Sequence, residues 1–189
     1  MVYQLLIELE GVEPRIWRRV RVEADCTMRT LHHVIQLSMG WENCHLYRFI
    51  AGDEIITQID FVDDDFVEDH EVYLDEYFTK AGQKMVYEYD FGDSWKHTIR
   101  LEEIIENDDE LVPRCLGGER NCPPEDIGGI GGYLNIIEVM KNPRIPEYEE
   151  MVDWYGGVYD SERFRLDLVN EDFEEFDDYV EDTENDWGF

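Results

Sequence analysis

Apolar and polar residues alternate at the start of the chain in the pattern of a β-hairpin. Every second residue of the segment 2–10 is apolar, and these residues are Tyr3, Leu5, Ile7 and Leu9. Turn-forming residues at 11–14 separate this segment from a second alternating one at 15–23. The sequence therefore predicts two antiparallel strands with a common buried face.

The apolar period then lengthens to between three and four over residues 28–39, which predicts a helix. Thr27 can cap its first turn, and Gly40 can end it. The stripe expected to face the core consists of Leu31, Val34, Ile35, Ser38 and Met39. His32 and His33 lie off this stripe, so we expect both to be solvated.

Short strands are expected next at 46–50 and 54–59, followed by a charged loop at 63–69. A long hairpin is predicted over 84–105. A three-residue loop there pairs Tyr89 with His97 and leaves all aromatic side chains on one face.

In the same register, Asp90 lies opposite Lys96 on the outer face of the hairpin. We therefore expect His97 to be embedded in an aromatic inner face.

Glycine, proline and helical patterns dominate the rest of the chain. Helices are expected from Gly132 to the residue before Pro143 and over 146–155, and Phe173, Phe176 and Val180 recur at helical spacing in the acidic C-terminal segment.

These elements predict a single α+β domain over residues 1–189. Residues 1–105 form a mostly antiparallel or mixed sheet with one helix, opening with a hairpin, a helix and a strand in a β-grasp-like order. Residues 112–182 form a Gly/Pro-rich loop and helices that cover the sheet.

The composition limits the partners. The 189 residues are 43% hydrophobic, enough for a sizeable core, and include 47 acidic and 16 basic residues, for a net charge of -31. Phosphate contacts need an excess of cations. We expect no nucleic-acid partner for the intact surface, and a basic protein as partner if the acidic surface is itself recognised.

Export and membrane signals do not occur in the sequence, which predicts a cytoplasmic protein without membrane contact. Its cysteines are then expected to be free thiols. They are Cys26, Cys44, Cys115 and Cys122.

The charge is distributed unevenly: residues 1–50 are neutral overall, whereas residues 171–189 contain ten acidic side chains and no basic one. The outer face of the second predicted strand carries Arg15, Trp17, Arg19 and Arg21. This face could bind nucleic acid or an acidic protein. We favour the alternative, in which the acidic C-terminal segment lies on these arginines and neutralises them.

Three blocks of sequence resemble a known family. They are Gly40-Trp41 followed by His45, YEYDFGDSWKH at 87–97, and CLGGERNCPPEDIGGIGGY at 115–133. Together they resemble the plasmid pRiA ORF-3-like family. The resemblance implies a compact α+β protein of unknown activity, associated with mobile elements, some of whose relatives are labelled transposon resolvases.

A resolvase activity does not fit the residues themselves. A serine resolvase needs an activated serine near its N-terminus beside an arginine cluster. The serines of this chain are Ser38, Ser94 and Ser161, and none has that setting.

Chemically active residues concentrate in and beside the blocks that carry this resemblance. The expected pocket contains His45, Asp90, Asp93, Trp95, His97, Cys115, Cys122, Glu125 and Asp126. His97, Cys115 and Cys122 are candidate zinc ligands, and a cysteine with His97 could form a nucleophile and base. In the competing interpretation, His97 is a hydrogen-bonded core residue and both thiols are small buried apolar groups.

From these patterns we expect a non-enzymatic interaction or accessory protein with no cofactor. The alternative is a metal-binding protein or an enzyme that uses the region of His97, Cys115 and Cys122.

Overall fold

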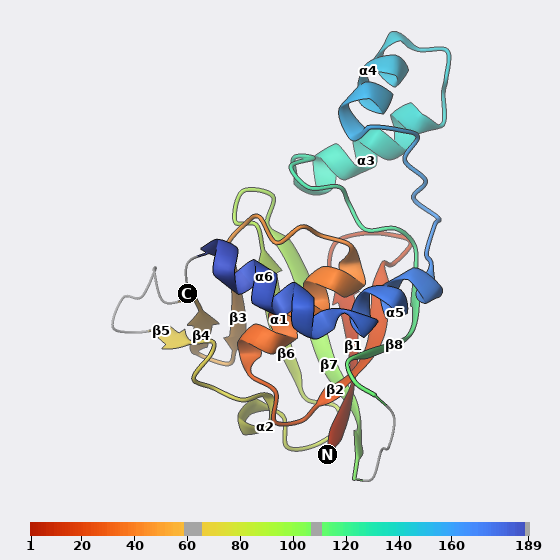
Figure 1. The fold of residues 1–189 in the computed structure, drawn as a ribbon. Helices are drawn as coiled ribbons and strands as arrows, with labels where there is room; N and C mark the ends of the chain where they lie inside the picture. The colour runs from red at the N-terminus through yellow and green to blue at the C-terminus, as the bar shows by residue number, and fades with distance from the viewer. Residues whose placement is uncertain (59–65, 107–110, 188–189) are drawn as a thin grey trace.

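One eight-stranded mixed sheet forms the centre of the protein in its computed structural model, which describes residues 1–58, 66–106 and 111–187 (Figure 1). The strand order is β5-β4-β3-β6-β7-β1-β2-β8. Neighbouring strands are antiparallel, except for the parallel pair β4 and β5. The strands are β1 (Val2–Leu9), β2 (Trp17–Glu23), β3 (Tyr47–Ala51), β4 (Glu54–Thr57), β5 (Phe66–Glu68), β6 (Lys84–Tyr89), β7 (Trp95–Ile105) and β8 (Arg114–Glu119).

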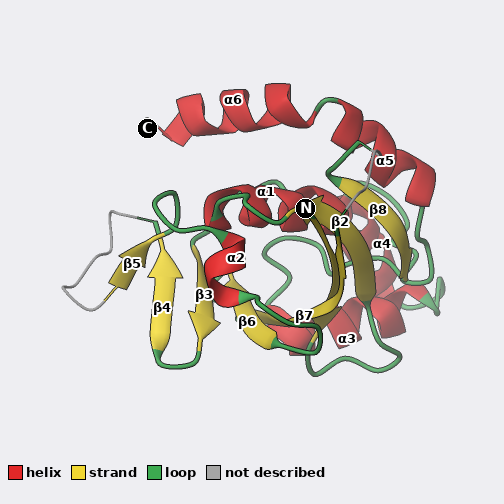
Figure 2. Ribbon diagram, turned by 90° about the horizontal axis from the view of Figure 1, so that it is seen from below, coloured by secondary structure: helices red, strands yellow, loops and turns green. Residues whose placement is uncertain are grey.

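The helices complete an α+β fold, as the sequence predicts. They are α1 (Met28–Met39), α2 (Leu74–Tyr77), α3 (Gly129–Met140), α4 (Pro146–Tyr155), α5 (Leu166–Glu174) and α6 (Phe176–Trp187). The sheet curves around α1, and α5 and α6 lie over the outer side of α1 (Figure 2). The pair α3 and α4 extends from one end of the sheet (Figure 1).

The α1 helix has the predicted ends. Thr27 accepts a hydrogen bond from the Thr30 amide, and Gly40 closes the helix with a φ of 83°. The prediction that His32 and His33 are solvated is wrong, since their exposed fractions are 0% and 3%. The sheet covers one side of α1 and α6 covers the other. The helix was expected to have a solvent-exposed face, but it is buried on nearly all sides.

The β6–β7 hairpin has a different register from the predicted one. Tyr87, not Tyr89, pairs with His97, because the connection spans residues 90–94. Asp90 has a φ of 53° and its Oδ1 accepts a hydrogen bond from the Gly92 amide, which builds this wider turn.

The register differs from the predicted one by two residues, so each side chain keeps its face. His97 is fully buried on the aromatic face, as expected. The outer partner of Lys96 is Glu88 instead of Asp90, with 3.9 Å between Nζ and Oε1.

The charged segment predicted at 63–69 is only partly a loop. Phe66–Glu68 form the edge strand β5 beside β4. Residues 63–65 lie outside the described residues.

Candidate functional site

Two loops and a hairpin meet at the C-terminal end of α1. The chain leaving α1 is fastened to the loop that precedes α3, because the Trp41 Nε1 donates to the Pro123 carbonyl at 2.9 Å and the Glu42 amide donates to Glu125 Oε1 at 3.0 Å. From the hairpin side, the Asp90 amide donates to the Leu46 carbonyl. Residues from three distant parts of the sequence are thereby held together.

His45 lies at the centre of this junction. Its Nε2 is 3.1 Å from Asp126 Oδ1, 3.8 Å from Asp90 Oδ2 and 3.9 Å from Glu125 Oε2. The Nε2 atom is buried and makes no hydrogen bond to any described atom. Three carboxylates thus surround one imidazole nitrogen whose hydrogen-bonding capacity is unused.

Glu125 is the most constrained of the three carboxylates. Its Oε1 accepts hydrogen bonds from the Tyr89 hydroxyl and the Glu42 amide, both at 3.0 Å, whereas its buried Oε2 has no partner among the described atoms. Burial raises the pKa of Glu125, and this effect exceeds the opposing effect of the two hydrogen bonds and of His45. A cation beside Oε2 would reverse that shift.

Cys44 and Tyr89 belong to the same junction. The Tyr89 hydroxyl accepts a hydrogen bond from the Cys44 amide at 3.1 Å and lies 3.9 Å from the Cys44 thiol. Burial, together with Glu125, raises the pKa of both side chains. Neither was among the pocket residues expected from the sequence, although Cys44 directly precedes His45 and Tyr89 lies on the aromatic face of the hairpin.

The donor atoms have spacings that suit a metal ion. Cys44, His45 and Glu125 form one set of ligand atoms within 4.8 Å of one another, and His45, Asp90 and Asp126 form another. Tetrahedral zinc with bonds of about 2.0–2.2 Å requires neighbouring ligand atoms to be about 3.3–3.6 Å apart. The separations around His45 bracket this range.

His97, Cys115 and Cys122 are not part of this junction. Within the described part of the chain, neither of the two ligand groups that contain His45, nor the group of Glu68, His70 and Glu71, includes them. Burial lowers the pKa of His97 to about 3, and neither ring nitrogen has a hydrogen-bond partner among the described residues. His97 is therefore a core residue, as the structural interpretation holds, but without the hydrogen bond expected for it.

The two thiols are also buried structural groups. Cys122 accepts a hydrogen bond from Arg18 at 3.4 Å and contacts Met39, while Cys115 contacts the Gly117 carbonyl. Burial raises the pKa of both thiols, more than nearby Arg18 lowers it. A thiolate nucleophile activated by His97 has no support in this arrangement.

Two further residues of the expected pocket have positioning roles. Asp93 Oδ2 accepts a hydrogen bond from the Gly128 amide at 3.0 Å, which ties the hairpin turn to the 122–128 loop. Trp95 is buried in the core beside Trp41, with 6.5 Å between ring centroids.

A small cavity adjoins the His45 junction. It has a volume of about 360 Å³ and lies between the end of α1, the loop before α3 and the end of α4. Glu125, Trp154 and Tyr155 are among the residues that line it. A compact organic ligand in this cavity would lie beside the His45 junction.

The arginine face of β2 lies on the other side of the sheet from α1. Arg18, the intervening residue, donates to the Ser38 carbonyl on α1, and side chains alternate along a strand. Helix α6 packs on α1 instead, where Glu184 approaches His33. The prediction that the acidic segment covers the arginines is therefore wrong.

Acidic residues of the sheet neutralise this face. Arg19 forms a 2.6 Å ion pair with Glu102, and Arg15 lies 4.0 Å from Glu119. The guanidinium groups of Arg15 and Arg19 each lie 5.2 Å from the Trp17 ring, whose Nε1 donates to Glu119. Arg21 lies on the same strand and also has an interaction partner. These contacts weaken the case for an anion-binding face.

Comparison with known proteins adds relatives but no activity. Residues 1–168 match the family described as plasmid pRiA4b ORF-3-like protein. The chain is 33% identical over 175 residues to the uncharacterized protein y4hQ of Sinorhizobium fredii, covering 89% of each chain. It is also similar to the crystal structure of MM3350, a protein of unknown function from Methanosarcina mazei, with a TM-score of 0.79, 36% identity and coverage of 87% of this chain and 95% of that one.

None of the helices in the described part of the chain is long and apolar enough to span a membrane.

Proposed function

The chain belongs to the plasmid pRiA4b ORF-3-like family, whose name supplies no activity, and we propose from the site itself that it binds a first-row divalent cation. The proposed ligands are His45 with either Asp90 and Asp126 or Glu125 and Cys44, the two sets whose donor atoms lie within 4.8 Å of one another. The observation that carries the proposal is the buried Nε2 of His45, which faces three carboxylates, the nearest at 3.1 Å, and has no hydrogen-bond partner among the described residues.

The burial of the carboxylates supports a cation. Only 9% of the Asp90 side chain and 16% of the Glu125 side chain are exposed, so solvent screens their repulsion poorly. A divalent ion would neutralise this charge and use the free Nε2 and Oε2 atoms. Asp126, which is 72% exposed, is the ligand at the mouth of the site.

The ligand chemistry narrows the choice of metal. Calcium and magnesium prefer sites made of oxygen atoms alone, whereas imidazole with carboxylates suits manganese, iron, cobalt or zinc. The thiol of Cys44 is close enough to His45 and Glu125 to replace one carboxylate for a softer ion. We therefore expect zinc and cobalt to bind more tightly than magnesium.

Calorimetric titration with Co²⁺ or Zn²⁺ tests this proposal, using full-length protein purified without an affinity tag and treated with a chelator. About one equivalent is expected to bind, with cobalt absorption bands that report the ligand field. His45→Gln should abolish this binding.

His70→Gln is the matched control, because His70 lies with Glu68 and Glu71 in a more exposed group that likewise combines one histidine with two carboxylates. The His70→Gln variant should still bind about one equivalent of the cation. If the wild-type protein binds no cation, or if both variants lose binding equally, the proposal fails.

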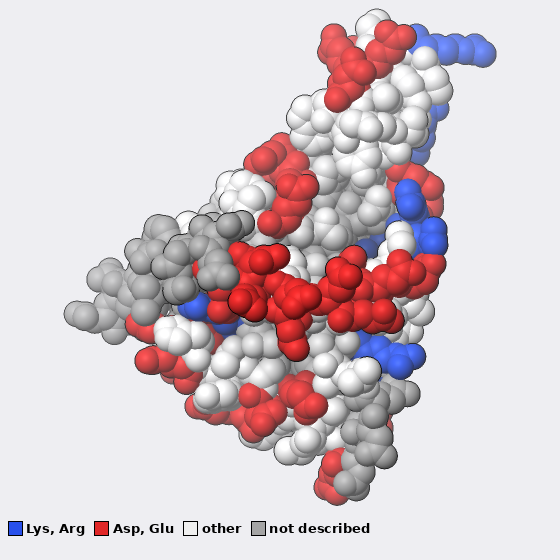
Figure 3. Space-filling model, viewed as in Figure 1, with Lys and Arg blue, Asp and Glu red and all other residues white. Residues whose placement is uncertain are grey.

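An interaction role is the second candidate, and a specific surface favours it. Helices α5 and α6 present a continuous band of acidic side chains on the face over α1 (Figure 3). The band contains Asp167, Glu171, Asp172, Glu174, Asp177, Asp178, Glu181, Asp182 and Glu184, together with Glu175 between the helices. Such a surface supports binding of a basic protein. Retention of polylysine that decreases steeply with salt would test it.

A further inference from the structure

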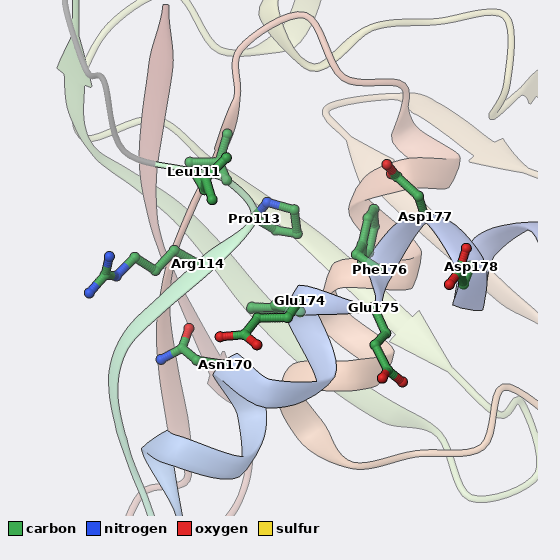
Figure 4. Close-up of a pocket in the computed structure, with 11 residues that line it drawn as sticks. Leu111, Pro113, Arg114, Asn170, Glu174, Glu175, Phe176, Asp177 and Asp178 are labelled. Atoms are coloured by element: carbon green, nitrogen blue, oxygen red, sulfur yellow. The ribbon is translucent and has the colours of Figure 1, made fainter.

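A groove separates residues 111–113, which lead into β8, from the junction of α5 and α6. Its volume is about 640 Å³. Figure 4 shows Leu111 and Pro113 on the strand side and Phe176 on the helix side, with Glu174 on the helix below them. The groove is distinct from the His45 junction and shares no lining residue with it.

The walls of this groove are fixed by specific contacts. The Asn170 side chain on α5 accepts a hydrogen bond from the Cys115 amide at 2.9 Å and donates to the Cys115 carbonyl at 3.0 Å. Phe173 and Phe176 pack edge to face with 6.2 Å between their centroids and are 7% and 8% exposed. A bound segment would therefore meet a preformed surface, which reduces the entropic cost of binding.

The lining of the groove is partly apolar and partly acidic. Leu111 is 91% exposed and, with Pro113 and Phe176, offers an apolar contact surface. Around it the exposed acidic residues are Glu174, Glu175, Asp177 and Asp178, against one basic residue, Arg114. An apolar floor within an acidic rim is complementary to a large apolar side chain flanked by lysine or arginine.

We propose that this groove binds a basic segment of a partner protein that inserts one large apolar side chain between Leu111, Pro113 and Phe176. The proposal rests on the second candidate function, since it assigns the acidic band a definite docking position. The acidic rim repels phosphate groups, which disfavours nucleic acid and anionic lipid as occupants. A second copy of the chain would bring two such rims together, which also disfavours self-association.

Fluorescence anisotropy with two labelled synthetic peptides tests the proposal on the full-length protein. One peptide carries several lysines around a single leucine, and its twin has serine in place of the leucine. The leucine peptide is expected to bind about tenfold more tightly, since one apolar side chain is buried. Leu111→Ser should remove this difference, and the exposure of Leu111 makes a folding defect unexpected.

A charge comparison locates the site independently. The variant Glu174→Gln, Glu175→Gln, Asp177→Asn and Asp178→Asn should weaken leucine-peptide binding about tenfold at low ionic strength. The matched control removes the same charge from exposed positions of α4 through Glu147→Gln, Glu149→Gln, Glu150→Gln and Asp153→Asn. It should weaken binding much less, and circular dichroism should show that both variants fold.

The outcomes separate the groove from the wider interaction role. If both peptides bind equally and Leu111→Ser has no effect, the acidic band binds basic chains but the groove proposal is overturned. If neither peptide binds, both proposals fail. A dimer in sedimentation experiments that Leu111→Ser dissociates would identify a second copy as the occupant and would likewise overturn the peptide proposal.

Discussion

Two histidines near the same end of the sheet, His32 and His45, have opposite environments. The His32 ring is fully buried and stacks on Tyr47 with 3.4 Å between centroids. Its Nδ1 is 2.8 Å from the Tyr87 hydroxyl and its Nε2 is 2.7 Å from Asn43 Oδ1. Every polar atom of this ring has a partner.

The His45 ring differs from the His32 ring in its exposure and in the hydrogen bonding of its Nε2 atom. Its side chain is 26% exposed, and its Nε2 faces carboxylates without forming a hydrogen bond. A closed polar network fixes one conformation of the core, whereas an incomplete one near the surface can accept a ligand. The comparison teaches that an unpartnered nitrogen marks a candidate ligand only where carboxylates face it, as at His45, because the buried His97 also has unpartnered nitrogens but lies beside aromatic rings.

The largest expected effect comes from breaking the closed cluster. His32→Ala should destabilise the protein by about 3–4 kcal/mol, because it removes a stacked ring and leaves Tyr87 and Asn43 with lost partners. Urea denaturation monitored by tryptophan fluorescence measures this loss. The milder Tyr87→Phe should cost about 1–2 kcal/mol. If His32→Ala lowered the free energy of unfolding by less than Tyr87→Phe does, the hydrogen-bond network of His32 would contribute little to stability.

A second prediction concerns the pH dependence of stability. In the unfolded chain His97 takes up a proton near its ordinary pKa of 6.5, but in the fold it stays neutral down to about pH 3. The unfolded state therefore binds more protons between these values, and stability falls as the pH drops, by up to ~1.4 kcal/mol per pH unit. The stability that depends on a neutral His97 is therefore fully present above pH 6.5 and is lost as the pH falls below it.

His97→Phe should remove this contribution, since phenylalanine fills the same aromatic environment beside Trp41 and Tyr87 without a titrating group. Free energies of unfolding measured at several pH values should show a shallower acid slope than in the wild type. His70→Phe, at a more exposed position, is the control that should keep the slope. Identical slopes for His97→Phe and wild type would contradict the assignment of this titration.

Local pattern predicted most of the fold. Alternation placed β1, β2 and the faces of β6 and β7, and the caps of α1 were visible at Thr27 and Gly40. The β6–β7 register was missed because Asp90 adopts a left-handed conformation that no alternation pattern encodes. The burial of His32 was missed because it depends on Tyr47 and Tyr87 of the sheet, and that of His33 because it depends on α6, a helix far away in the sequence.

The site was predicted in part. Four of the residues expected in a pocket, His45, Asp90, Glu125 and Asp126, do converge. His97, Cys115 and Cys122, the candidate zinc ligands of the alternative interpretation, do not join them, because residue type indicates ligand chemistry but not which strand face or loop presents it. Convergence here depends on hydrogen bonds between the loop after α1 and the loop before α3, which a single sequence does not reveal.

The smallest predicted effect, that of His45→Ala on stability, is the sharpest test of the comparison between His32 and His45. His45→Ala, the same truncation as at His32, should change the free energy of unfolding by less than about 0.5 kcal/mol without added metal, because the side chain is partly solvated and Nε2 makes no hydrogen bond. With a cation at a hundredfold excess over its dissociation constant, the wild type should gain about 2.7 kcal/mol and the variant almost nothing. A large loss without metal would make His45 a structural histidine like His32, since only a ligand can be dispensable for the fold and necessary for the metal-dependent gain.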